Sequence, residues 1–216
     1  MRYNNILFIH CPKNGGTYIQ EVIFKYRSNL VKSQYNYFGN KFKKNYHDVP
    51  YILKVLIFII TFFVYHEHFT LQQYSRKYDL RKLEILFVCR NPYDRLLSSY
   101  NFLNFSGDFN SFLDQIESCR KAQSSLRFIY IDPMFYAHSR NQTDYIKFNK
   151  SIYPRVHIIP LENKGKLKHF CNLNNLNYET QKINLSKKRR TILTLSEKER
   201  IYRIFKEDFD YFGYPK

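Results

Sequence analysis

The sequence of 216 residues contains no tryptophan, no internal repeat and no cysteine pair of the Cys-x-x-Cys type. This cysteine spacing argues against a zinc ribbon and against a dithiol redox pair, so we expect buried free thiols. The four thiols belong to Cys11, Cys89, Cys119 and Cys171. The apolar run Val55–Tyr65 spans only eleven residues, whereas a bilayer span needs about 20. We therefore expect no transmembrane segment in this chain, and interpret the run as a helix end followed by a central strand.

Acidic residues are also scarce, with 18 Asp and Glu against 35 Lys and Arg and a formal charge of +17. Such an excess implies an anionic partner. Nucleic acid satisfies the charge, but the basic residues are spread along the chain and only Lys187–Arg190 forms a dense run, so nucleic acid is not expected as the main partner. Because the first predicted strand begins near residue 5, we expect no signal peptide or N-terminal anchor, and hence a cytoplasmic location.

The pattern of apolar runs predicts the α/β class. Strand-length runs lie at 5–10, 62–66, 84–89 and 156–160, and helix-like stretches separate them, as in a parallel sheet flanked by helices. The predicted helices are Gly16 to about Leu30, Pro92–Leu103, and Leu195–Phe212 with its cap near Ser196. Segments 28–50 and 104–155 are interpreted as irregular loops. The length and the 44% hydrophobic content favour one domain over 1–216.

The stretch Ile6–Thr17 joins an apolar strand to a helix through a Lys-x-Gly-Gly-Thr turn. Paired glycines let backbone N–H groups converge on an oxyanion, the helix adds its positive end, and Lys13 adds a charge. The loop is neither a Walker loop, where lysine follows the last glycine, nor a dinucleotide fingerprint, which needs a third glycine. The alternative is a glycine-rich turn without a ligand.

A second motif, Glu84–Tyr100, repeats the order of apolar strand, turn and helix. Pro92 suits a first helical turn, Asn91 suits a cap, and Arg90 then stands at the carboxyl end of a strand, where ligands gather in parallel sheets. Ser98 lies eight residues further on, within reach of the same anion, so Arg90 and Ser98 predict a second phosphate site. In the alternative interpretation Arg90 pairs with Asp94, and Ser98 only lines the helix.

The two motifs together resemble those of sulfotransferases that use 3′-phosphoadenosine 5′-phosphosulfate. Pro12-Lys-Asn-Gly-Gly-Thr17 is similar to the family's 5′-phosphosulfate loop, and Arg90-Asn-Pro-Tyr-Asp-Arg-Leu-Leu-Ser98 to its 3′-phosphate motif. The resemblance implies a P-loop-like parallel sheet, the sulfotransferase fold, and one nucleotide donor that bridges both loops. It implies donor contacts from Pro12, Lys13, Asn14, Gly15, Gly16, Thr17, Tyr18, Arg90 and Ser98.

Further stretches resemble the carbohydrate branch, most closely the heparan sulfate 2-O-sulfotransferases. Tyr65-His-Glu-His-Phe69 resembles a histidine-x-histidine strand end that faces the acceptor hydroxyl. Asn141–Ile146 resembles a Pro-Gln-x-x-Tyr-Leu stretch of the same branch. Ile183–Ser186 resembles an Asn-x-Ser segment, which adds Ser186 to the implied donor site. The chain departs from the family at Asn14, where a hydroxyl residue or cysteine is usual, and at Tyr18, where serine is common.

The resemblance implies in-line transfer of a sulfonate group to an acceptor hydroxyl. His68 would remove the hydroxyl proton, with His66 as an alternative base, and Lys13 would stabilise charge on the departing phosphate oxygen. No metal is expected. The implied acceptor is an anionic glycan or another hydroxyl compound. Because relatives of this branch normally carry an anchor, the Golgi lumen is expected if this chain is a truncated form.

Two other interpretations remain open from the sequence. His66 and His68, together with His10 at a neighbouring strand end, suit a metal-dependent hydrolase or oxygenase. The excess of basic residues equally suits a module that binds heparin or nucleic acid without turnover.

Overall fold

The computed structural model describes residues 2–3, 5–24, 68–123, 133–179, 190 and 192–216. Several predictions fall outside these residues: the strand 62–66, the site residues His66 and Ser186, and the first helix beyond residue 24. All four cysteines are buried and free, as the sequence predicts. Within the described part, no helix is long and apolar enough to cross a membrane.

The main sheet has the strand order β1-β2-β3-β6. Strands β2 (Ile6–Ile9), β3 (Glu84–Cys89) and β6 (Val156–Pro160) run parallel, while the short β1 (Arg2–Tyr3) pairs antiparallel with β2. The predicted α/β class with a parallel sheet is confirmed for these three strands. The sequence analysis did not anticipate β1.

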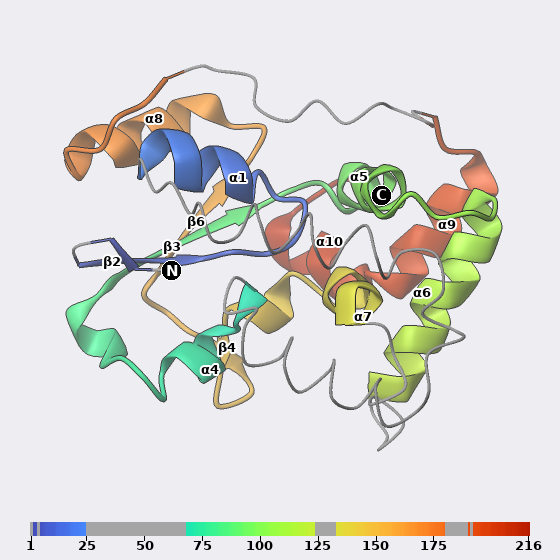
Figure 1. The fold of residues 1–216 in the computed structure, drawn as a ribbon, viewed down its shortest axis with the longest axis horizontal. Helices are drawn as coiled ribbons and strands as arrows, with labels where there is room; N and C mark the ends of the chain where they lie inside the picture. Colours follow the sequence, from blue (N-terminus) through green and yellow to red (C-terminus); the bar gives the residue numbers. More distant parts are fainter. Residues whose placement is uncertain (1, 4, 25–67, 124–132, 180–189, 191) are drawn as a thin grey trace.

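Helices and short turns cover both faces of this sheet (Figure 1). One face packs against α1 (Gly16–Tyr18), its continuation as a π-helical turn over Ile19–Ile23, and α8 (Lys164–Leu173). The other face packs against α4 (Leu71–Tyr74) and the 3₁₀ turns Leu80–Lys82 and Thr143–Tyr145. The hairpin of β4 (Lys147–Phe148) and β5 (Ser151–Ile152) lies beside α4. Because successive strand residues point to opposite faces, β2 is apolar throughout.

The remaining helices form a third apolar cluster beyond the carboxyl ends of the parallel strands (Figure 1). They are α5 (Pro92–Leu103), α6 (Phe109–Gln123), α7 (Pro133–Ser139), α9 (Leu195–Ile204) and α10 (Lys206–Phe212). The prediction for α5 is confirmed, including Pro92 in the first turn and the Asn91 side chain that accepts from the amide of Tyr93. This cluster holds α7, and the turn after it, against the ends of β2 and β3.

The prediction of an irregular segment over 104–155 is wrong, because α6 and α7 occupy much of it. Phe109, Phe112, Leu113 and Ile116 are all buried in the third cluster. Their spacing is that of one apolar helix face, which is a signal present in the sequence. The Asp108 carboxylate accepts from the amide of Ser111 and so caps the start of this helix.

The predicted C-terminal helix Leu195–Phe212 is two helices, α9 and α10, separated at Phe205. The cap is Thr194 and not Ser196, because Thr194 and Glu197 exchange side-chain and backbone hydrogen bonds in a capping box. The break at Phe205 matters for the site, since α10 then carries the buried side chain of Asp208 towards the sheet.

Candidate anion-binding site at the carboxyl ends of the strands

The loop between β2 and α1 has a backbone shape suited to an anion. Lys13 and Gly15 both adopt left-handed conformations, with φ of 67° and 76°, on either side of Asn14. Such alternation turns successive N–H groups towards one point. The amides of Gly15, Gly16 and Thr17 have no hydrogen-bond partner among the described residues, as is usual for the first turn of a helix. These three donors are available to a ligand.

A close neighbour requires glycine at position 16, and the backbone conformation favours glycine at position 15. A Cβ on Gly16 would lie 1.7 Å from His10 Nε2, and one on Gly15 would lie 2.7 Å from Leu161 Cδ1. Gly15 also has the positive φ that glycine adopts without a steric cost. The Gly-Gly pair therefore lets the loop pass close to the ring of His10, the residue that follows β2.

Arg90 brings the second predicted loop onto the first. It follows the last residue of β3, and its Nη1 donates to the carbonyl of Lys13 at 3.0 Å. Burial lowers the pKa of its guanidinium. Arg90 and Asp94 are not within ion-pair distance, although the Asp94 carboxylate is near enough to oppose the fall in the pKa of Arg90. The guanidinium keeps further N–H donors for a ligand.

Lys13 is the second cation of the site. Its Nζ lies 3.9 Å from the centre of the Phe102 ring, a cation–π contact with helix α5. Burial, followed by repulsion from Arg90, lowers the pKa of Lys13 to about 8. Among the described residues no carboxylate lies within ion-pair distance of Lys13 or of Arg90. The carboxylates of Asp94 and Glu162 are near enough only to oppose the fall in the pKa of Arg90. Two neighbouring cations without a carboxylate in ion-pair contact form a site that an anion would stabilise.

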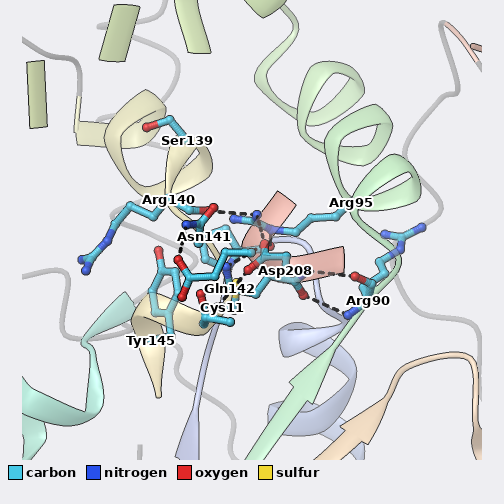
Figure 2. A network of polar contacts seen from close by, with 12 residues as sticks. Cys11, Arg90, Arg95, Ser139, Arg140, Asn141, Gln142, Tyr145 and Asp208 are labelled. Carbon is cyan, nitrogen blue, oxygen red and sulfur yellow. Dashed lines mark hydrogen bonds and ion pairs between the residues drawn. The ribbon is translucent and has the colours of Figure 1, made fainter. Parts of the chain in front are cut away.

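Gln142 joins the two loops (Figure 2). Its Oε1 accepts from the Arg90 amide at 2.9 Å and from Asn14 Nδ2 at 2.7 Å, and its Nε2 donates to the Arg90 carbonyl at 2.9 Å. The Arg90 backbone thereby determines which side-chain atom of Gln142 is oxygen, and Gln142 in turn determines the orientation of the Asn14 amide. Asn14 Nδ2 also donates to the Val88 carbonyl, whereas its buried Oδ1 has no partner.

A buried ion pair between Asp208 and Arg95 holds the backbone of Gln142 in place. Asp208 accepts from the backbone amides of Gln142 and Thr143 at 2.8 and 3.1 Å, and lies 3.9 Å from Arg95 Nη1. Arg95 Nε donates to the carbonyl of Pro12. Burial raises the pKa of Asp208, and Arg95 and the amide donors oppose that rise. Helix α5 thus reaches the backbone of the first loop through Arg95, and α10 reaches the backbone of Gln142 and Thr143 through Asp208. The sequence analysis did not single out either charged side chain.

His68, the predicted base, lies beside the first loop. Its Nδ1 is 3.1 Å from the His10 carbonyl, and the two rings are 4.6 Å apart. Because a carbonyl only accepts, Nδ1 carries the proton and Nε2 keeps its lone pair. Burial lowers the pKa of His68 to about 4, although the bond to His10 opposes the fall. The imidazole is therefore neutral near pH 7.

A third histidine, His138, was missed by the sequence analysis. Its Nδ1 lies 2.8 Å from Ser99 Oγ, which donates to the Arg95 carbonyl, and its ring stacks on Phe102. Burial lowers the pKa of His138 well below its usual range, and the neighbouring cations Arg95 and Lys13 add to the effect. Ser99, the neighbour of the predicted Ser98, is thus the serine that joins this network.

The other predicted site residues differ in whether their side chains bond to the protein itself. The Tyr18 hydroxyl donates to the Glu179 carbonyl, away from the loop, and Asn14 Nδ2 donates to the protein itself. The hydroxyls of Thr17 and Ser98 are partly buried, with no hydrogen-bond partner in the described part of the chain. The metal alternative stays untested at His66, and across the described residues no group of three His, Cys, Asp or Glu side chains is placed to hold a metal.

Comparisons of this chain with protein-family models, with curated proteins and with solved structures found no match. The function must therefore be argued from the residues of the site and from the motifs in the sequence.

Proposed function

We propose that this protein is a sulfotransferase that moves a sulfonate group from 3′-phosphoadenosine 5′-phosphosulfate to an acceptor hydroxyl, with a carbohydrate as the acceptor class. The sulfotransferase fold belongs to the same proposal. The observation that carries it is the contact between the two loops: Arg90 donates to the Lys13 carbonyl, and no carboxylate of the described residues lies within ion-pair distance of either cation. A nucleotide with phosphates at both ends of its ribose supplies two anions to such a pair.

In this proposal the amides of Gly15, Gly16 and Thr17 and the ammonium of Lys13 bind the 5′-phosphosulfate. Arg90 binds the 3′-phosphate, with Ser98 as a further donor. Lys13 stabilises the negative charge that grows on the phosphate oxygen as its bond to sulfur breaks. The two loops act mainly by holding the donor in line with the attacking oxygen.

His68 is the proposed base. The acceptor O–H proton goes to Nε2 of His68 as the oxygen forms its bond to sulfur, and the bisphosphate leaves with the bonding pair. A pKa of about 4 makes the free imidazole a weak base. The negatively charged 5′-phosphosulfate of the donor, bound beside Lys13, would raise that pKa towards the working pH because it favours the protonated ring. His66 is the alternative base.

The acceptor class follows from resemblance and from charge. The net charge of +17 suits a sulfated or carboxylated glycan. No metal takes part in the proposed reaction.

Ligand-induced stabilisation tests the donor class. At a ligand concentration 100 times the dissociation constant, binding contributes about 2.7 kcal/mol, which corresponds to a rise in the unfolding temperature of roughly 5–10 °C for a chain of this size. We expect this rise with 3′,5′-adenosine bisphosphate and a smaller one with ATP or NAD. Equal stabilisation by all three nucleotides, or none by the bisphosphate, would overturn the proposal.

Turnover is tested separately, with radiolabelled donor and heparan-type acceptors. Transfer that Lys13→Ala abolishes supports an enzyme. Tight binding of the glycan that survives both Lys13→Ala and His68→Ala, without transfer, would instead identify a binding module.

A further inference from the structure

The side chain of Gln142 contacts both loops, beside the direct links that Arg90, Arg95 and Asn14 form between them. Residues 14, 90 and 142 come from three segments far apart in the sequence. In Figure 2 the Gln142 amide lies at the centre of the network, between Cys11 and Arg90. The question is what this amide does for the ligand.

The side-chain amide of Gln142 forms the same pair of hydrogen bonds with the Arg90 backbone that a neighbouring β-strand would form. Its Oε1 accepts from the Arg90 N–H and its Nε2 donates to the Arg90 carbonyl, both at 2.9 Å. This pair of bonds extends the ladder of β3 by one residue beyond its last strand partner, where Cys89 pairs with Pro160. The backbone of Arg90, and with it the root of the guanidinium, is held in place.

The same oxygen also holds the first loop. Asn14 Nδ2 donates to Gln142 Oε1 at 2.7 Å, and Asn14 stands between the two left-handed residues Lys13 and Gly15. The backbone of Gln142 is itself held in place, because its N–H donates to the buried carboxylate of Asp208. One fully buried side chain therefore holds both loops at once.

We propose that Gln142 is a positioning residue that sets the spacing between the two loops and so makes the site selective for a nucleotide with both a 5′ and a 3′ phosphate. This inference rests on the proposed function and deepens it. Gln142 touches neither phosphate; it acts through Asn14 and Arg90. Without this link each loop still binds its own phosphate, but the two no longer match one ligand.

The measured quantity is the dissociation constant for adenosine 5′-monophosphate divided by that for 3′,5′-adenosine bisphosphate. Both constants are measured by calorimetry on the full chain. Energetic coupling between two sites typically amounts to 5–150-fold. We expect Gln142→Met, which keeps the length of the side chain and removes the amide, to lower the ratio about tenfold, within that range. The affinity for the monophosphate should stay near that of the parent protein. A purely structural role would weaken both ligands together and leave the ratio unchanged.

Thr143→Val is the matched control. Thr143 is the next residue, equally buried, and its backbone amide donates to the same Asp208, but its Oγ1 has no partner. Replacing that hydroxyl by a methyl group keeps the shape, so the ratio should not change. If Gln142→Met does not fold, Asn14→Ala is measured instead. This variant removes the hydrogen bonds of Asn14 to Gln142 and to Val88, and leaves the bonds between Gln142 and Arg90.

The outcomes separate the two proposals. If the parent protein prefers the bisphosphate and a folded Gln142→Met or Asn14→Ala variant retains the full ratio, the role of Gln142 is refuted while the proposed function stands. If the parent protein binds both nucleotides equally, the proposed function fails as well. A fall in the ratio confined to the two variants, with Thr143→Val unchanged, supports the inference.

Discussion

The pKa of Lys13 yields a quantitative prediction about anion binding. Burial and the charge of Arg90 lower that pKa from 10.5 to about 8, which corresponds to about 3 kcal/mol against the charged form. A bound phosphate supplies the missing opposite charge and raises the pKa again. The protonated protein therefore binds the anion more tightly than the deprotonated protein.

The size of the effect follows from the titration. With a pKa of about 8, about nine tenths of free Lys13 is charged at pH 7 and about one tenth at pH 9. The affinity for 3′,5′-adenosine bisphosphate should therefore fall about tenfold between pH 7 and pH 9. The second ionisation of a phosphate monoester lies near pH 6, below this window, so the ligand contributes little to the fall.

Calorimetry at several pH values measures this affinity directly. Repeating the titration near pH 8 in buffers of different ionisation enthalpy should reveal uptake of about half a proton per ligand, because half of the free Lys13 is uncharged there. Lys13→Arg is the control, since arginine keeps its charge throughout. A pH dependence that persists in Lys13→Arg, or none in the parent protein, would refute the reasoning.

Three further predictions concern single residues. Arg90→Ala should weaken binding of the bisphosphate by about 1.5–3 kcal/mol, the usual size of a charge-assisted hydrogen bond, while binding of adenosine 5′-monophosphate changes little; an equal loss for both nucleotides would count against a 3′-phosphate contact. His68→Ala should lower kcat by about 10²–10⁴-fold at unchanged donor affinity, and turnover equal to that of the parent protein would exclude this base. In the parent protein the pKa of free His68 is about 4, so kcat/KM should hold its value as the pH falls through 6.5. Gly16→Ala should abolish nucleotide binding because its Cβ would lie 1.7 Å from His10 Nε2. Gly165→Ala is the control and should leave binding intact, since the nearest neighbour of its Cβ is 3.6 Å away. Circular dichroism checks that both variants fold.

The sequence patterns that predicted structure correctly are local ones. The strand–turn–helix units around Gly15 and Arg90 depend on neighbours in the chain: apolar runs, a glycine pair, a proline in the first helical turn. Such signals act within a few residues, and the parallel strands β2, β3 and β6 and helix α5 follow from them. The apolar spacing of α6 was equally local, and the failure to predict that helix came from reading its polar residues as a loop.

The sequence by itself determined that two strand ends carry Lys13 and Arg90, and that both face the same edge of a parallel sheet. Only the tertiary structure decided how the two are joined. Gln142, Arg95 and Asp208 come from separate segments, and each is buried only because it satisfies backbone groups of a distant loop. A lone buried polar residue has no periodicity and no spacing that marks it in a sequence. Its role depends on which N–H and C=O groups packing leaves unpaired beside it, and packing is a property of the whole fold.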